Sequence, residues 1–425
     1  MPFFSRSPSE SLRSSETGDS LSEAFLNTSS VRDTLPEQYR IHFDELRSGI
    51  LAFCHEFNIP VETLRNKETF GKQLTSKKIP PERMAEAVVL FERLEYLIAH
   101  RKPLKETHPE YLEEAEHLYH LREQYASQVA LLEQAGILEE GAVTGVNRKK
   151  YPIPTLEQVA QHLFERESEL SVKRNQGFTK LLLVPFGMGL DDLCVALEYV
   201  LLTHKERHSD FKLDTHDPVK VQGDYPEAVL KDPSKIVYFP RFFSEDKHQG
   251  RTKFQILEDQ ERDSDSIPGW RVHLLQPSDP ADPDSKGFAS IFKKGQGKVY
   301  GEENPRADFE ADKAPSDYLS ILEKAKEDII SPYHGESGLT PEDWILAFMT
   351  HLQETGQPLD LIQGGGNFET CLIGSFFPSP THWPSISHLY VPRMSWNHVF
   401  NRVDFASFAS TGQIWNFGIH TSVII

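Results

Sequence analysis

Two glycines in the middle of the chain stand where a nucleotide-binding turn would place them. Gly187-Met188-Gly189 follows an apolar run at residues 180–184 and precedes an apolar helical pattern, which predicts a buried strand turning into a helix. In dinucleotide-binding turns such glycines let the backbone approach a pyrophosphate at the helix N-terminus. Here Asp191 and Asp192 put two negative charges where that phosphate would lie. We therefore favour an ordinary strand-to-helix turn.

Charged side chains that follow a predicted strand at residues 236–239 could act as acids, bases or phosphate ligands. Arg241, His248 and Arg251 lie in this segment, and histidine titrates near neutral pH. The sequence fixes neither a nucleophile nor an orienting partner for them. A solvated surface loop is the interpretation we favour, and a nucleotide-dependent enzyme with its site in residues 180–275 is the alternative.

Metal ligands with a recognisable spacing occur once. Glu114 and His117 form a Glu-x-x-His pair, but carboxylate-bridged metal sites in helical bundles need a second copy and two further glutamates. Cys54, Cys194 and Cys371 lie far apart and form no Cys-x-x-Cys pair, which disfavours a thiolate zinc site and a disulfide framework. We expect no metal, no cofactor and a reducing, cytoplasmic compartment.

The C-terminal segment, residues 361–425, has the composition of a binding surface. It holds two acids (Glu369, Asp404) and two arginines (Arg393, Arg402), so the whole net charge of −19 belongs to the first 360 residues. It also holds eleven aromatic residues among many Ser, Asn and His side chains. Rigid aromatic surface provides contact area at little entropic cost, and small polar groups add adaptable hydrogen bonds. The alternative is a β-rich core whose aromatic side chains point inward.

A succession of short motifs in this segment resembles the end of a known fold. The motifs are Gly364-Gly365-Gly366, residues 371–377, Val391-Pro392, Ser395-Trp396-Asn397, Arg402-Val403-Asp404-Phe405 and Trp415-Asn416-Phe417-Gly418-Ile419-His420. Together they resemble C-type-lectin-like domains of the formylglycine-generating-enzyme type. They are most similar to the variable proteins of diversity-generating retroelements. His420 stands where that family typically has Arg.

The resemblance implies recognition rather than turnover. Oxidase members of the superfamily need a cysteine pair near the carboxyl end, and this segment has only Cys371. In the diversified members, scattered positions in the last loop and strands form the binding face. The ligand-binding candidates that the resemblance implies here, with Trp396 and Trp415 as framework, are Ser395, Trp396, Asn397, His398, Phe400, Asn401, Asp404, Ser407 and Phe408.

The elements that must position these residues change in kind along the chain. Residues 35–177 have helical periodicity, with one pattern over residues 84–98, a longer helix over residues 111–132 and a further helix from Thr155, its N-cap, to Leu170. Residues 178–360 predict strands at 180–184, 236–239, 254–257 and 270–275. They also predict helices at 190–205, 316–328 and from Thr340 to 354. Residues 361–425 lack helical periodicity, which favours short β-segments.

The fold class we predict is α+β: an N-terminal helical bundle, a mixed α/β middle and a compact, β-rich, C-type-lectin-like end. The domains are a disordered Ser-rich tail (1–34), a helical domain (35–177), a mixed region (178–360) and the end of a binding domain (361–425). Residues 1–30 contain no apolar run of the kind found in a secretory signal, and prolines interrupt the uncharged stretch 370–392. We therefore expect no membrane span.

The function we predict is ligand recognition through an aromatic and polar C-terminal surface that is open to diversification. Its partner should be a macromolecule, most simply a protein, because a net charge of −19 disfavours nucleic acid. The helical domain could support a homo-oligomer. Besides the enzyme, a helical assembly or scaffold protein is a second alternative.

Overall fold

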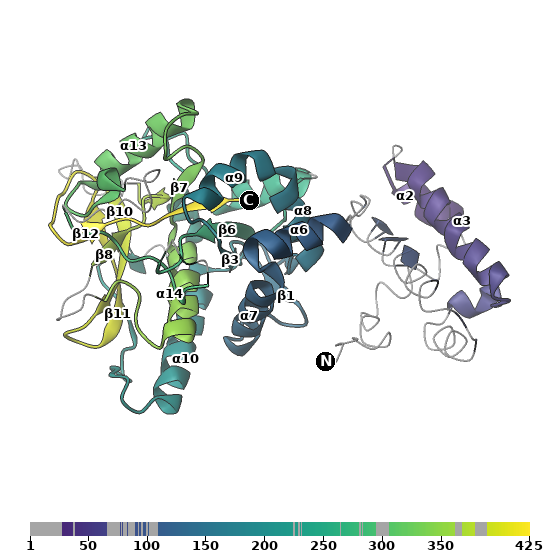
Figure 1. Cartoon of the computed structure of the whole chain (residues 1–425), viewed down its shortest axis with the longest axis horizontal. Helices are drawn as coiled ribbons and strands as arrows, with labels where there is room; N and C mark the ends of the chain where they lie inside the picture. Colours follow the sequence, from purple (N-terminus) through teal and green to yellow (C-terminus); the bar gives the residue numbers. More distant parts are fainter. Residues whose placement is uncertain are drawn as a thin grey trace. The chain divides into compact units, whose positions relative to one another are not determined.

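The chain divides into two compact units, Met1–Glu106 and Thr107–Ile425 (Figure 1). The computed structural model describes residues 28–36, 39–65, 109–223, 232–279 without 264, 284–294, 306–361, 368–378 and 389–425, with isolated residues between these ranges. The architecture is mixed α+β, as predicted. The boundaries that we placed after residues 177 and 360 both lie inside the second unit.

The first unit is built on helices α2 (Thr28–Thr34) and α3 (Arg40–Glu56) and a short 3-10 helix, η2 (Val61–Arg65). Val31 and Leu35, four residues apart, are both buried, and Arg32 Nε lies 2.9 Å from Asp44 Oδ2 on α3. Residues 28–34, which we predicted within the disordered tail, are therefore helical because their apolar face packs. The predicted helix over residues 84–98 and the tail before Thr28 lie largely outside the described residues.

The long helix predicted over residues 111–132 is wrong in one respect, because it is broken in two. Helix α6 (Pro109–Tyr119) ends before His120, whose φ is 50°, and α7 (Leu121–Gln134) begins after it. The side chain of Glu116 caps the new start, since its Oε2 accepts the Arg122 N–H at 2.8 Å. Apolar spacing of three and four residues continues across the break, so periodicity alone did not reveal it.

Capping residues place three of the remaining helices. Thr155 caps α8 (Leu156–Glu165) and Thr340 caps α14 (Pro341–Thr355), as predicted. The single helix predicted from Thr155 to Leu170 is wrong in its length, because it is interrupted at Arg166 and α9 (Glu167–Asn175) follows. The strand predicted at residues 254–257 is wrong: Thr252 and Gln255 form a capping box, and α12 (Lys253–Arg262) starts there. Helices α10 (Leu190–Arg207) and α13 (Pro315–Glu327) confirm the two other predictions, and η3 (Pro233–Lys235) and η4 (Ala307–Phe309) are short 3-10 helices.

Two larger sheets organise the second unit. One has the order β12 (Phe417–Gly418), β8 (Glu369–Cys371), β10 (Tyr390–Asn397), β11 (Arg402–Ala409), β4 (Val219–Val221). The other has the order β3 (Lys180–Val184), β6 (Arg271–Leu275), β13 (Thr421–Ile424), β7 (Glu336–Gly338). Two-stranded ribbons join β1 (Ala142–Thr144) to β2 (Lys150–Pro152) and β5 (Val237–Tyr238) to β9 (Ser375–Phe376). Both larger sheets mix strands of the middle region with strands of the C-terminal segment.

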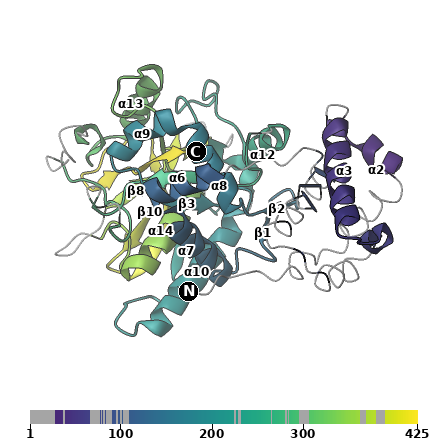
Figure 2. The same ribbon diagram turned by 45° about the vertical axis from the view of Figure 1, so that its right-hand side comes forward.

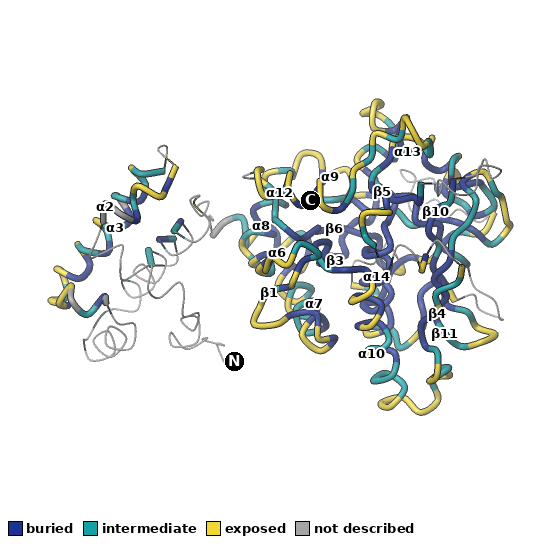
Figure 3. Tube along the Cα trace, turned by 180° about the vertical axis from the view of Figure 1, so that it is seen from behind, coloured by how far each residue is buried: buried dark blue, intermediate teal, exposed yellow. Residues whose placement is uncertain are grey.

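Helix α14 is the centre of this unit. It packs against α7, α10, β3 and β10, and every residue from Pro341 to Leu352 is buried. Figure 1 and Figure 2 show α7, α10 and α14 beside one another, and Figure 3 shows the buried strands β3, β6 and β10 around them. The core is therefore shared by the middle region and the C-terminal strands.

In the part of the chain that the structure describes, no helix combines the length and the apolar character that crossing a bilayer requires.

Candidate functional site

The residues that the sequence singled out for ligand binding come together in one antiparallel hairpin. Strands β10 and β11 pair Ser395 with Asp404, and Asn397 with Arg402, so residues 398–401 form its tip. Ser395, Trp396 and Asp404 are buried, whereas His398 and Phe400 are exposed. Partly buried side chains complete the set: Asn397, Asn401, Ser407 and Phe408. Only the tip therefore presents predicted residues fully to solvent.

A polar network fixes the conformation of the tip. Asn397 Oδ1 accepts the N–H groups of Val399 at 3.1 Å and of Phe400 at 3.2 Å. Asn397 Nδ2 donates to Asp404 Oδ2 at 2.7 Å, and Arg402 Nε donates to Asp404 Oδ1 at 2.9 Å. The Arg402 guanidinium carbon lies 4.8 Å from the centroid of the Phe400 ring. The exposed ring is thus held by the same network that closes the turn.

The middle region supports the hairpin from the other side. The Asn401 carbonyl, at a residue with φ of 53°, accepts the Asp214 N–H at 2.8 Å. Strand β4 runs parallel to β11, with Val219 opposite Val403. The Trp396 ring lies 5.4 Å from Phe211, measured between centroids, and is 3% exposed, so this residue packs as framework and does not offer the ligand contact for which it was also a candidate.

Apolar side chains project from two turns of the C-terminal segment. Val399 and Phe400 at the hairpin tip are 67% and 56% exposed, and Trp415 in the turn before β12 is 68% exposed. The prediction of Trp415 as framework is therefore wrong. Arg402, which we did not choose as a site residue, completes the tip; its two-residue spacing from Asp404 places both side chains on one face of a strand.

The glycine turn before α10 is filled by the protein itself. A Cβ built on Gly187 would lie 3.1 Å from the Tyr151 ring and 3.2 Å from the Gly269 Cα. Asp191 and Asp192 occupy the first turn of α10, as predicted, and burial together with the charge of Asp191 raises the pKa of Asp192. Packing accounts for the glycine, and carboxylates stand where a phosphate would bind.

The charged residues after β5 are engaged with their neighbours. Arg241 Nε donates to Glu323 Oε2 at 2.9 Å, and Arg251 Nη1 lies 2.7 Å from Asp259 Oδ2. His248 Nδ1 accepts the Gly250 N–H at 2.9 Å. No group of three potential metal ligands occurs among the described residues, which include Glu114 and His117.

A serine on β13, a histidine on β6 and an aspartate on α14 lie in the order of a catalytic triad. Ser422 Oγ is 2.9 Å from His273 Nδ1, and His273 Nε2 is 3.1 Å from Asp343 Oδ1. All three residues have an exposed fraction of 0%, so no substrate can reach the hydroxyl. Burial lowers the pKa of His273, which favours the neutral imidazole. We interpret the arrangement as structural.

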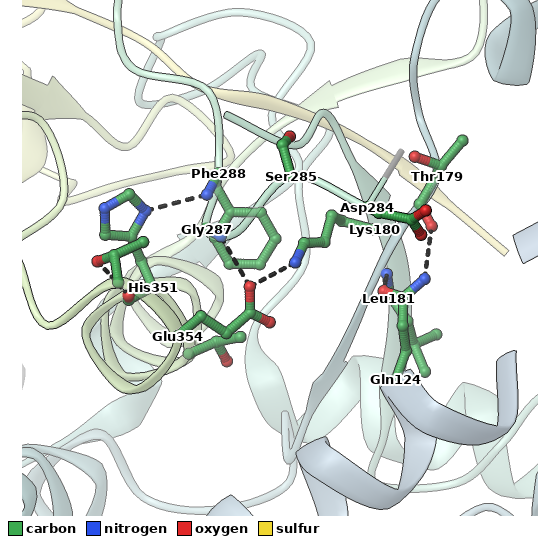
Figure 4. A network of polar contacts seen from close by, with 12 residues as sticks. Gln124, Thr179, Lys180, Leu181, Asp284, Ser285, Gly287, Phe288, His351 and Glu354 are labelled. Atoms are coloured by element: carbon green, nitrogen blue, oxygen red, sulfur yellow. Dashed lines mark hydrogen bonds and ion pairs between the residues drawn. The ribbon is translucent and has the colours of Figure 1, made fainter. Parts of the chain in front are cut away.

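A second polar network joins β3, α14 and the loop before residue 290 (Figure 4). Lys180 Nζ pairs with Glu354 Oε2, which also accepts the Gly287 N–H at 2.7 Å. His351 Nδ1 accepts the Phe288 N–H at 2.9 Å, so this nitrogen carries no proton. Burial lowers the pKa of His351 to about 4, although the carboxylates of Asp360 and Glu354 oppose that change.

Comparison of the chain with protein-family models, with curated proteins and with solved structures gives no match.

Proposed function

We propose that this protein recognises a macromolecular partner, most simply another protein, through the tip of the β10–β11 hairpin. The observation that carries the proposal is an exposed aromatic ring, Phe400, on a turn whose backbone and flanking side chains are already ordered. Ordering a surface before binding removes an entropic cost that flexible loops incur on association. Phe400 is thus placed to act as an anchor residue, with Val399 and His398 beside it.

The same proposal includes three more detailed features: an N-terminal helical bundle, a C-type-lectin-like end and a C-terminal surface open to diversification. Support comes from the gathering of Asn397, Phe400 and Asp404, three candidates that the resemblance implied, in one network. The C-terminal segment also completes the second unit, because β13 lies between β6 and β7.

A nucleotide-dependent enzyme in residues 180–275 and a scaffold protein are the alternatives. The Tyr151 ring lies against Gly187, and Arg241 and Arg251 each form an ion pair with an acidic side chain. These contacts weigh against a nucleotide site in this region. No observation favours either alternative over recognition.

The test compares Phe400→Ala with Trp415→Ala, a matched loss of an exposed aromatic ring elsewhere in the segment. Each full-length variant is immobilised, and the proteins retained from a lysate of the source cells are quantified by mass spectrometry. We expect a set of proteins that wild type and Trp415→Ala retain and that Phe400→Ala loses by about tenfold or more, as for an anchor residue. Equal retention by all three proteins would remove the proposal.

A further inference from the structure

Residues 287–291, which we call the strap, are fastened to α14 by side chains that titrate. Glu354 Oε2 accepts the Gly287 N–H at 2.7 Å, and His351 Nδ1 accepts the Phe288 N–H at 2.9 Å. Figure 4 shows both bonds. His351 and Glu354 lie three residues apart on α14, and therefore on one face of the helix. The start of the strap is thus held by two acceptors in succession.

The other contacts of the strap do not involve α14. On one side it is bonded to residues 276–278 through backbone groups alone: the Ser278 N–H donates to the Gly287 carbonyl at 3.1 Å, and the Ala289 N–H donates to the Gln276 carbonyl at 3.0 Å. At its far end Asp360 Oδ1 accepts the N–H of residue 291 at 3.0 Å. The strap can therefore leave α14 and still remain attached to its other neighbours.

A proton on His351 is incompatible with the closed strap. Neutral imidazole accepts a hydrogen bond through the nitrogen that carries no proton, whereas both nitrogens of imidazolium are donors. Protonation of Nδ1 would set two N–H groups, of His351 and of Phe288, against each other. The strap also approaches the ring closely, since a Cβ built on Gly287 would lie 2.6 Å from His351 Nδ1. The new N–H therefore has no room unless ring and strap separate.

Among the described residues, four charged groups act on His351 besides its burial. The carboxylates of Asp360 and Glu354 favour its protonation, whereas His420 and Lys180 oppose it. Each carboxylate is already paired: Glu354 with Lys180, and Asp360 Oδ2 with His420 Nε2 at 2.8 Å. Burial has the largest effect and lowers the pKa of His351 to about 4. Opening of the strap would admit water to the ring, so the open form binds a proton more readily and acid favours it.

We propose that the strap is released by acid: a proton on His351 frees residues 287 and 288 from α14 while the rest of the second unit stays folded. Release exposes the Phe288 ring, which is 1% exposed in the closed form. It also widens the cavity of about 40 Å³ that the strap lines together with Arg306 and His420. An apolar surface thereby becomes available only in acidic surroundings. None of these residues belongs to the hairpin tip, so the proposal does not depend on the proposed function.

The experiment measures hydrogen exchange of the full-length protein by mass spectrometry at pH 7, 6 and 5. Each rate is divided by that of the unfolded chain at the same pH. For peptides covering residues 284–294 we expect the open fraction to rise about twentyfold from pH 7 to pH 5, because the ring takes up a proton near pH 6.5 when open and near pH 4 when closed. Urea below the unfolding transition should leave this exchange unchanged, since a local opening exposes little surface, but should accelerate exchange in β3.

Two variants identify the group that titrates. His351→Asn keeps an acceptor for the Phe288 N–H but takes up no proton, so its strap should exchange with no dependence on pH. His420→Gln removes the other histidine that lines the same cavity and should keep the twentyfold rise. Circular dichroism verifies that both variants are folded.

Four results would overturn the proposal. They are strap exchange in wild type that follows the unfolded chain at every pH, a pH dependence that persists in His351→Asn, its loss in His420→Gln, and equal urea dependence of exchange in the strap and in β3. The last would mean that acid destabilises the whole unit without releasing the strap first.

Discussion

His351 should make the stability of the second unit depend on pH between about 6.5 and 4. Burial lowers the pKa of His351 from its ordinary value of 6.5 to about 4, and Nδ1 of the neutral ring accepts the Phe288 N–H. The unfolded chain takes up a proton near pH 6.5, whereas the folded chain does so only near pH 4. Stability is therefore complete above pH 6.5 and is lost as the pH falls through this interval.

The magnitude follows from the two pKa values. Their difference of about 2.5, from 6.5 to about 4, corresponds to about 3 kcal/mol at 1.36 kcal/mol per unit. About 2 kcal/mol of this should already be lost at pH 5, because the unfolded form is then almost fully protonated and the folded form is not. Such a loss is a large share of the free energy of unfolding of an ordinary domain.

The assay is urea unfolding of wild type and His351→Asn at pH 7, 6, 5 and 4.5. The asparagine carbonyl can still accept the Phe288 N–H, but it does not titrate. The difference in free energy of unfolding between the two proteins should shrink by about 2 kcal/mol from pH 7 to pH 5. His216→Asn, at an exposed histidine, is the control and should leave the pH profile unchanged. A difference that stays constant with pH would refute the reasoning.

Three further predictions concern packing and buried charge. Gly287→Ala should cost about 2–4 kcal/mol, because Gly287 has φ of +76° and its Cβ would lie 2.6 Å from His351 Nδ1. Gly335 has φ of +78° and open space around it, so Gly335→Ala should cost only about 1 kcal/mol in thermal unfolding. Equal losses of stability in the Gly287→Ala and Gly335→Ala variants would contradict the prediction. Trp396→Ala should lose about 3–5 kcal/mol through the cavity it leaves, against under about 0.5 kcal/mol for the exposed Trp415→Ala; a small loss at Trp396 would show that its burial is not as described. Lys253→Met should lose about 3–5 kcal/mol by leaving Glu342 as an unpaired buried charge, and Lys253→Met with Glu342→Gln should recover most of it. No recovery in the double variant would place the cost elsewhere.

Local signals predicted the elements whose ends are set by a few neighbouring residues. Thr155 and Thr340 each accept a backbone N–H three residues later, and both helices begin where these caps require. The run at residues 180–184 is buried throughout, as expected for a strand covered on both faces. The strand prediction for residues 254–257 was wrong because four residues are too few to show whether the apolar side chains recur every 3.6 residues, as in a helix, or every 2, as in a strand.

Interactions between distant residues could not be predicted from the same signals. Strand β13 pairs with β6, about 150 residues earlier. No local pattern in the sequence distinguishes this partner from another apolar strand. The buried ion pair of Arg271 on β6 with Asp343 on α14 likewise joins residues about 70 positions apart. Arg271 itself is ordinary in the sequence, and only the fold shows that it is buried beside Asp343.

The C-terminal aromatic residues show why composition alone cannot orient a surface. Trp396 and Phe400 lie four residues apart, yet one is 3% exposed and the other 56% exposed. The difference arises because Met394, Ser395 and Trp396 are all buried within β10, whereas Phe400 lies in the turn beyond Asn397, the last residue of β10 that pairs with β11. An aromatic residue in this segment is therefore core where the ladder continues and surface where it ends. If the C-terminal segment is diversified, substitutions at residues 398–400 should be tolerated, whereas substitutions at Trp396 and Phe405 should unfold the second unit.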